Sequence, residues 1–428
     1  MSAPIAERRI EQRRAFHAYP EPSWCEFLTT SRLVDRVKEI GVDEVHVGEA
    51  AIAADERVGV PDDDTLERWR TRAAERGARE DVLDATAGGA TGLVAVLDRG
   101  PGPVVGLRVD IDALPFEEAS DDAHEPAVEG FRSENEGIMH ACGHDAHMTI
   151  GLSVLETVAA SDFSGTFKVF FQPAEEVLGG GRPMAESGHV DDVDAFFAVH
   201  VGFGHPTGEV VAGARSRLAI RQTRARFTGE AAHAGAAPHE GRNAMQAMAA
   251  TVQNVYGIAR HADALTRLNV GRVEAGSASN VVADDAVLEL EARAGTNDVL
   301  DYLTERVDRV LEHAGAMHDC ELSTETVGRA PRVDSDDALA DVVGAVASGV
   351  PAVETVRPSA PFGASEDATY LMRRVQENGG LATYVIVGTD HPSGHHTPRF
   401  DVDEASIDIG VDVLTGAIGR AFADDLAS

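Results

Sequence analysis

Lysine is almost absent from this chain. Of its 37 lysine and arginine residues only Lys38 and Lys168 are lysines, and 72 aspartates and glutamates bring the formal net charge to −35 at pH 7. Such an excess of one sign repels itself within a compact chain, and salt screens that repulsion. We therefore hypothesise that the protein works in a high-salt cytoplasm. The same charge disfavours nucleic acid and anionic membranes as partners, because both are polyanions.

Cysteine is also scarce, with three residues and no Cys-x-x-Cys pair. This excludes a disulfide framework and a zinc ribbon. No apolar run approaches the length of a membrane span, and the charged first ten residues do not resemble a signal peptide, so we expect a cytoplasmic protein. A length of 428 residues with 43% hydrophobic residues predicts a globular chain of two or three domains.

Metal-binding groups are concentrated in Met139–His147, which reads Met-His-Ala-Cys-Gly-His-Asp-Ala-His. A thiolate and imidazoles suit borderline-soft divalent metals, and Gly143 leaves Cys142 and His144 room to turn toward one centre. The apolar run that follows predicts a buried helix beginning near Asp145. The alternative is a loop of surface histidines with a structural cysteine, but the density of ligand types favours a metal site.

Further candidate ligands follow short apolar runs that predict buried strands. These runs and the residues after them are Val104–Val109 with Asp110 and Asp112, Phe167–Phe171 with Glu175 and Glu176, Ala195–Val199 with His200, and Thr383–Val387 with His395 and His396. Open α/β sheets place their chemistry at the carboxyl ends of strands. We therefore expect these side chains to meet at one edge of a sheet.

The pattern changes between residues 216 and 329 to strand-helix-strand-strand-helix-strand, which suits a small separate α+β layer. The expected strands are Leu218–Phe227, Leu268–Val273, Ala286–Arg293 and Glu321–Thr326, and the expected helices are Ala244–Ala262 and Asp298–Ala316. We infer a larger domain, residues 1–215 and 330–428, interrupted by this smaller one. A largely helical insertion is expected at about residues 55–85.

The candidates together are Cys142, His144, Glu175, Glu176, His200 and His396. Five ligands overfill one tetrahedral site but suit two ions that share a ligand. Of two adjacent glutamates, one can bind metal while the other moves a proton. The rival chemistry is a nucleophilic Cys142 with His144 as its base. Two residues apart, they are poorly placed to share a proton, and that chemistry leaves both glutamates unused.

These motifs resemble the dinuclear metallo-amidohydrolases of the M20 peptidase clan. Its acyl-amino-acid branch carries Met-His-Ala-Cys-Gly-His-Asp, a Gln-Pro-Ala-Glu-Glu turn and a late His-x-Pro, and the insertion and Ser365–Thr369 resemble its p-aminobenzoyl-glutamate-hydrolysing group. The resemblance runs over nearly the whole chain. It implies an α/β fold: a mixed-sheet dinuclear-metallopeptidase catalytic domain with an inserted smaller α+β (ferredoxin-like) lid or dimerisation domain.

The resemblance also implies roles for single residues. The bridging thiolate is Cys142, and the further ligands are His144, Glu176, His200 and His396, with His395 the alternative to His396. Glu175 is the expected general base. Asp110, Asp112 and Asp145 are expected to orient the ligands. Two divalent ions are implied, with manganese favoured and zinc or cobalt as alternatives.

In the lid, the segment around His233 resembles the family's lid motif, which implies that His233 stabilises the tetrahedral oxyanion from its own chain or across a dimer. Asn280 and Arg293 match positions that hold substrate carboxylate or carbonyl oxygens, and an arginine fork suits an acidic amino acid. On their own, the three could equally be a loop residue, a turn cap and the partner of a surface acid. Many members have Trp-Pro after the ligand histidine where this chain has Val201-Gly-Phe-Gly, so the acyl-side pocket is not predicted.

We therefore expect a metal-dependent amidohydrolase that cleaves the amide between an acyl or aroyl group and an amino acid. The small-molecule substrate implied by the resemblance is p-aminobenzoyl-glutamate, and a homodimer or heterodimer is expected through the lid. The alternatives are a broad N-acyl amino acid hydrolase or carboxypeptidase, and a catalytically silent partner that completes another chain's site.

Overall fold

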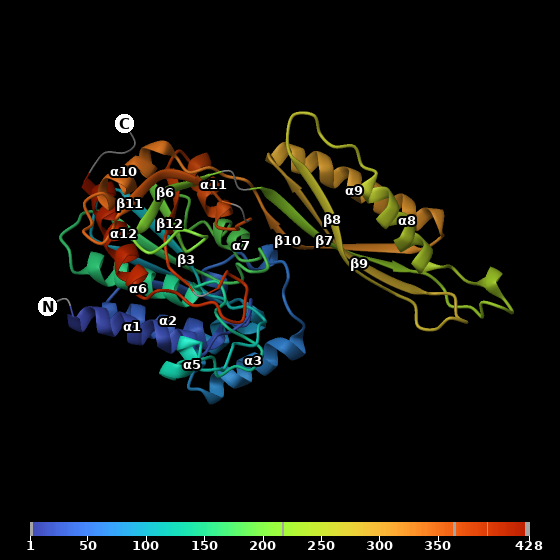
Figure 1. Cartoon of the computed structure of the whole chain (residues 1–428), viewed down its shortest axis with the longest axis horizontal. Helices are drawn as coiled ribbons and strands as arrows, with labels where there is room; N and C mark the ends of the chain where they lie inside the picture. Colours follow the sequence, from blue (N-terminus) through green and yellow to red (C-terminus); the bar gives the residue numbers. More distant parts are fainter. Residues whose placement is uncertain (1–2, 216–217, 363–364, 392, 424–428) are drawn as a thin grey trace. The chain divides into compact units, whose positions relative to one another are not determined.

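The computed structural model describes residues 3–215, 218–362, 365–391 and 393–423. The chain folds as two compact units, each with its own sheet (Figure 1). The first unit consists of Met1–Arg215, Val333–Phe362 and Asp367–Ser428, and the second of Ser216–Arg332 and Gly363–Glu366. The second unit is therefore inserted in the sequence of the first.

The first unit is built on a mixed eight-stranded sheet in the order β1-β2-β4-β3-β5-β12-β6-β11. The strands are β1 (Glu44–Val47), β2 (Leu93–Asp98), β3 (Val104–Asp110), β4 (Thr166–Gln172), β5 (Ala195–Val201), β6 (Glu209–Arg215), β11 (Thr355–Pro361) and β12 (Leu381–Val387). The four neighbours β4, β3, β5 and β12 run parallel, so their carboxyl ends lie at one edge. The predicted α/β fold with a mixed sheet is confirmed.

Helices of the first unit pack on this sheet. They are α1 (Ala3–His17), α2 (Phe27–Ile40), α3 (Asp63–Glu75), α4 (Glu80–Ala85), α5 (Glu125–Glu129), α6 (His144–Ala159), α7 (Gly181–Ala185), α10 (Asp337–Ala347), α11 (Thr369–Glu377) and α12 (Ala405–Ala423). Helix α6 is buried along most of its length and contacts β3, β4 and β5 as well as α1 and α12. No helix in the described part of the chain is long and apolar enough to span a membrane.

The segment from residue 54 to residue 89 is largely helical, with α3, α4 and the short turns η2 (Ala54–Glu56) and η3 (Ala87–Gly89). Leu66 and Trp69 of α3 and Leu83 of α4 pack on Phe27 and Leu28 of α2. This apolar contact attaches the segment to the first unit as a covering layer over α2.

The second unit is a four-stranded antiparallel sheet with two helices. Its elements are β7 (Ala219–Thr228), α8 (Ala244–Tyr256), β8 (Thr266–Ala275), β9 (Asp285–Ala294), α9 (Asn297–Met317) and β10 (Glu321–Ala330), in the strand order β10-β7-β9-β8. Helix α8 ends six residues before the predicted Ala262, at Tyr256, and Gly257 follows it. Alternate residues of β9, such as Leu288 and Leu290, enter the core under the helices.

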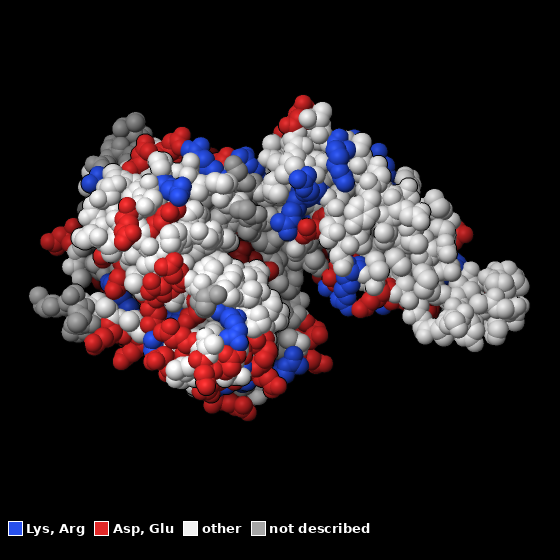
Figure 2. Space-filling view, in the orientation of Figure 1, with Lys and Arg blue, Asp and Glu red and all other residues white. Residues whose placement is uncertain are grey.

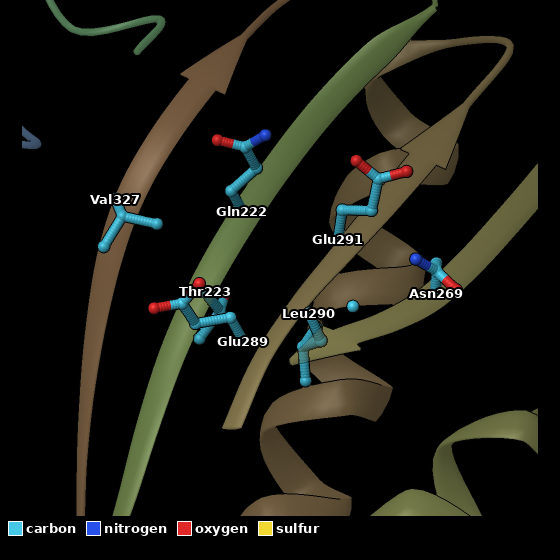
Figure 3. Close-up of a pocket in the computed structure, with 8 residues that line it drawn as sticks. Gln222, Thr223, Asn269, Glu289, Leu290, Glu291 and Val327 are labelled. Atoms are coloured by element: carbon cyan, nitrogen blue, oxygen red, sulfur yellow. The ribbon is translucent and has the colours of Figure 1, made fainter. Parts of the chain in front are cut away.

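The remaining residues of β9 point away from that core and are polar. A shallow pocket on this sheet is lined by Gln222, Thr223, Asn269, Gly271, Glu289, Leu290, Glu291 and Val327 (Figure 3). Its two acids and two amides include no thiol or imidazole, and it contains none of the residues predicted from the sequence to bind metal or substrate. The candidate chemistry lies elsewhere.

Candidate metal centre

The predicted ligands lie at the shared edge of the four parallel strands. β3 ends at Asp110, β4 at Gln172 just before Glu175, and β5 contains His200 as its next-to-last residue. The loop after β12 carries His396, whose backbone N–H donates to the carbonyl of Ala141 (2.8 Å). Segments far apart in the sequence therefore meet because parallel strands end at the same side of a sheet.

His144 is the first residue of α6, and one of its ring nitrogens is fixed. Its Nδ1 lies 2.8 Å from the backbone carbonyl of Asp112, which makes Nδ1–H the donor and leaves Nε2 unprotonated. Gly143 precedes the helix with φ 86°, and a Cβ there would lie 2.6 Å from Val201 Cγ2. Only glycine therefore fits the turn that aims His144 into the site.

Cys142 and His200 face each other across the site. The Cys142 Sγ lies 3.4 Å from His200 Nε2, and His200 Nδ1 donates to the carbonyl of Val201 (2.8 Å). The ligand atoms of Cys142, His144 and Glu176 all lie within 4.8 Å of one another. One thiol, two imidazoles and a carboxylate thus converge on a buried volume.

Glu176 and His396 complete the group, since His396 Nε2 lies 3.4 Å from Glu176 Oε2. His396 has a left-handed backbone (φ 59°), a strained conformation that recurs where function requires it. His395 points away: its Nε2 lies 3.2 Å from the Val201 carbonyl, and its ring stacks on Phe203. The geometry favours His396 over His395 as the final ligand.

Glu175 lies beside this group, with its carboxylate 3.9 Å from His144 Nε2. Asp110 and Asp112 hold imidazoles and backbone rather than open space. Asp110 accepts a hydrogen bond from His147 Nδ1 (2.5 Å), and Asp112 Oδ2 accepts one from the backbone N–H of Glu176 (3.0 Å).

Asp145 lies one residue into α6, and its carboxylate points toward α1. It is 2.7 Å from Arg13 Nε and 2.8 Å from His17 Nδ1. All three of these side chains are buried. Asp145 therefore anchors the start of α6 and does not enter the metal group.

Two supporting residues were missed by the sequence reasoning. His147 lies close enough to Asp110, His144 and His200 to look like a ligand, but its Nε2 accepts the Val201 N–H (2.9 Å) and its Nδ1–H is committed to Asp110. It therefore holds Asp110 and the end of β5. Arg108 is fully buried and donates to Asp110 Oδ2 (2.7 Å). An arginine inside an apolar strand run was the available signal.

Charge is unbalanced in this group without a cation. Burial, with two neighbouring carboxylates, raises the pKa of the Cys142 thiol well above its usual range. Burial also raises the pKa of Glu176 to about 8. For His144 burial opposes protonation, but Asp110 and its neighbours outweigh it and raise the pKa to about 10. All three shifts follow from carboxylates crowded into a buried volume.

The donor set fits divalent metal. His144 Nε2 and Glu176 Oε1 are buried with no hydrogen-bond partner among the described residues. Such atoms are costly unless something binds them, and a cation satisfies both while stabilising the thiolate and carboxylate forms. Soft, borderline and hard donors together suit a first-row divalent ion.

The lid residues fall into two places within the second unit. His233 pairs with Val281, and the Ala234 N–H donates to the Asn280 carbonyl (2.9 Å), so His233 and Asn280 are neighbours. Arg293 lies near the far end of β9 and forms a bidentate pair with Glu291 (3.0 Å for both bonds). At about 3.4 Å per residue, β9 separates it from the Asn280 end by about 25 Å.

The His233 ring has a defined tautomer. Its Nδ1 accepts the backbone N–H groups of Gly235 and Ala236 (3.1 Å each), so the proton is on Nε2. The side chain is partly exposed. His233 thus presents a hydrogen-bond donor to its surroundings.

Comparison with known proteins agrees with this geometry. The chain matches the model of Peptidase family M20/M25/M40 over residues 106–420, which include every candidate ligand. It is 43% identical over 407 residues to the indole-3-acetyl-aspartic acid hydrolase of Enterobacter agglomerans, covering 94% of this chain and 93% of that protein. It is 40% identical over 415 residues to one of the two-letter-coded polypeptides of the p-aminobenzoyl-glutamate hydrolase of Escherichia coli (strain K12), covering 96% and 95%.

A solved structure shows the same fold. The aminobenzoyl-glutamate utilization protein from Klebsiella pneumoniae aligns with a TM-score of 0.83 and 34% identity, over 97% of this chain and 95% of that one. The family match covers well over half of the sequence, and the buried thiol, imidazoles and carboxylates form a metal-binding group. The chain therefore belongs to peptidase family M20/M25/M40 and is a metal-binding hydrolase of that family.

Proposed function

We propose that the protein is a dinuclear metal-dependent amidohydrolase that cleaves p-aminobenzoyl-glutamate into p-aminobenzoate and glutamate. The observation that carries the proposal is the convergence of a thiol, imidazoles and a carboxylate beside Glu175. Two of the relatives are named for substrates that join an aromatic acyl group to an acidic amino acid. That shared chemistry supports an N-aroyl acidic amino acid as the substrate class.

The residues that would hold the metal are Cys142, His144, Glu176, His200 and His396, with Cys142 shared between two ions. Bound divalent ions lower the pKa of a water molecule and polarise the scissile carbonyl. Manganese is the proposed native ion because carboxylate ligands favour harder metals, with zinc and cobalt as alternatives. Metal-depleted protein reconstituted with each ion in turn, followed by turnover and metal analysis, tests this choice.

Glu175 is the proposed general base. It would accept a proton from the attacking water and deliver it to the leaving amine nitrogen. The His233 Nε2–H would donate a hydrogen bond to the oxygen that becomes negative in the tetrahedral intermediate, and Arg293 would pair with the substrate carboxylate. In that role Arg293 exchanges Glu291 for the substrate.

We further propose that the lid pairs with the lid of a second copy or of a different chain. His233 and Arg293 are about 25 Å apart along β9, farther than a small amide substrate reaches, so one site would take them from two lids. β8 is an edge strand with unpaired backbone groups. Exposed apolar side chains lie on and beside β8 and α8, at Met245, Tyr256, Leu265 and Val273. Light scattering after size-exclusion chromatography measures whether this chain alone dimerises.

The acidic surface supports a salt-rich cytoplasm as the working medium. Residues 216–332 carry 13 arginines against 16 acids, so nearly all of the net −35 belongs to the first unit. Acidic side chains dominate that unit's surface in the view shown (Figure 2). Salt screens such repulsion. Unfolding and activity measured from millimolar to molar potassium chloride test the proposal, which fails if the protein stays folded and active without molar salt.

The decisive experiment is turnover of p-aminobenzoyl-glutamate, hippurate and N-acetyl-glutamate by the metal-reconstituted protein. We expect p-aminobenzoyl-glutamate to have the highest kcat/KM. Equal values for all three would overturn the substrate assignment in favour of a broad N-acyl amino acid hydrolase. Glu175→Ala should abolish activity of the assembled enzyme. If activity persists, this chain is catalytically silent and a different chain performs the catalysis.

A further inference from the structure

A buried segment near the N-terminus lies directly against the loop that carries the two glutamates. Ser23, Trp24, Cys25 and Glu26 are all buried, with Trp24, Cys25 and Glu26 at 0% exposure. Trp24 has a left-handed backbone (φ 64°), which is rare for a bulky residue. The segment joins α1 to α2 and contains none of the metal ligands.

Glu26 is hydrogen-bonded to the residue immediately before Glu175. One carboxyl oxygen accepts the backbone N–H of Ala174 (2.8 Å), and the other lies 2.5 Å from the Thr91 hydroxyl. Burial and the nearby Asp112 raise the pKa of Glu26 well above its usual range, so the group is neutral. In that form its hydroxyl donates to Thr91 while its carbonyl oxygen receives Ala174.

Ala174 is in a conformation that needs such support. Its φ of 52° is left-handed, which is unfavourable for a residue with a Cβ. Its carbonyl accepts the N–H groups of Gly179 and Gly180 (3.0 and 3.2 Å), so the turn from Ala174 to Gly180 closes on this residue. The direction in which Glu175 leaves the chain is therefore set at Ala174.

The same segment supports the other side of Glu175. The Ser23 hydroxyl donates to Asp112 Oδ2 (2.6 Å), and that oxygen also accepts the N–H of Glu176 (3.0 Å). The backbone N–H groups of the residues on both sides of Glu175 are thus held by carboxyl oxygens bonded to, or part of, this one segment.

The helical insertion is attached to this segment as well. The indole N–H of Trp24 donates to the carbonyl of Val58 (2.8 Å), and the Arg57 guanidinium lies 5.5 Å from the Trp24 ring centre. A Cβ on Gly179 would lie 2.6 Å from the same Val58 carbonyl. The insertion therefore closes over the segment and over the end of the glutamate turn.

We propose that Glu26 is a positioning residue for Glu175: by holding the Ala174 N–H it fixes the turn that aims the catalytic carboxylate. This inference rests on the proposed role of Glu175 as general base. Glu26 touches neither substrate nor metal in this scheme. Its contribution is to rate at saturating substrate, since misplacing a reacting group by about 1 Å can cost on the order of 100-fold.

A neighbouring glutamate provides a matched control. Glu21 is also buried, and its two oxygens accept the N–H groups of Leu28 and Thr29 (3.0 and 2.8 Å) at the start of α2. Its side chain forms no hydrogen bond to the glutamate turn among the described residues. Glu21 and Glu26 thus share burial, residue type and backbone acceptance, and differ in which backbone they hold.

The experiment compares Glu26→Ala, Glu26→Gln and Glu21→Ala by kcat, KM, bound metal and melting temperature, each as full-length, metal-reconstituted protein. We expect Glu26→Ala to lower kcat about 10- to 100-fold, with KM within about threefold and metal content unchanged. Glu26→Gln should recover most of kcat, because its amide oxygen accepts Ala174 and its NH₂ donates to Thr91. Glu21→Ala should lower the melting temperature and leave kcat within about threefold.

Two results would overturn the proposal: kcat of Glu26→Ala matching that of Glu21→Ala, or Glu26→Gln as slow as Glu26→Ala. If Glu26→Ala does not fold, Thr91→Val tests the same contact. It removes the hydroxyl that holds the second oxygen and should lower kcat severalfold, and an unchanged kcat would refute the proposal. Failure of the proposed function is separate, because the wild-type protein would then not turn over p-aminobenzoyl-glutamate.

Discussion

Replacing Arg13 by alanine should destabilise the first unit far more than an exposed ion pair would predict. Arg13 lies in α1 with 1% of its side chain exposed, and its guanidinium is 2.7 Å from Asp145 and 2.5 Å from Asp401. Truncation leaves both carboxylates buried without their cation. Removing one partner of a buried pair costs about 3–5 kcal/mol, because the remaining charge keeps its desolvation penalty.

Arg8 provides the control on the same helix. It also joins α1 to α6, through Glu156 (2.9 Å), but the two side chains are 55% and 41% exposed. Arg8→Ala should cost less than about 1 kcal/mol. Urea unfolding followed by tryptophan fluorescence at fixed salt and metal gives both free energies of unfolding. Losses within about 1 kcal/mol of each other would refute the argument that burial, rather than the ion pair itself, sets the cost.

Three further predictions concern metal, pH and substrate. Cys142→Ser should lower bound divalent metal from two ions per chain to one or none, measured by mass spectrometry of the metals, with the circular dichroism spectrum unchanged. His17 has a pKa raised to about 9: burial and Arg13 oppose protonation, but its two carboxylate partners outweigh them. Because the folded pKa is above the unfolded value of about 6.5, its stabilisation is full below that pH and is lost as pH rises through 9; wild type should lose up to about 3 kcal/mol over this window, and His17→Gln should not. Phe203→Ala should lower kcat/KM for p-aminobenzoyl-glutamate about tenfold and for N-acetyl-glutamate less than threefold, because an aromatic contact is worth about 0.5–1.5 kcal/mol beyond its area; equal losses would exclude Phe203 from acyl recognition.

The strands that carry the site could be predicted because they are buried on both faces. Runs such as Phe167–Phe171 are apolar almost without interruption, and the observed β4 extends them by one residue at each end. Edge strands lack this pattern. β11 contains two prolines and is mostly exposed, and β1 is only four residues long, so neither produced an apolar run. α8 was expected to be too long because its alanine-rich composition continues beyond Gly257.

The ligands were predictable from local sequence, because their types are rare and closely spaced. Their supports were not. Arg13 meets Asp401 across 388 positions and Glu26 meets Ala174 across 148, and no local pattern encodes a contact of that separation. His147 shows the opposite error that density invites: it belongs to the same short motif as the ligands, yet both of its ring nitrogens are occupied by protein atoms.

The first 30 residues therefore contribute position rather than chemistry. Arg13 and His17 hold the start of α6, where His144 projects, and Glu26 holds the turn before Glu175. These contacts are buried and charged or polar, so they are directional and cannot be replaced by general apolar packing. A variant that kept every ligand but lost this segment would retain the donor set without its geometry. The catalytic arrangement thus depends on residues that never touch metal, and substitutions there should change rate before they change metal content.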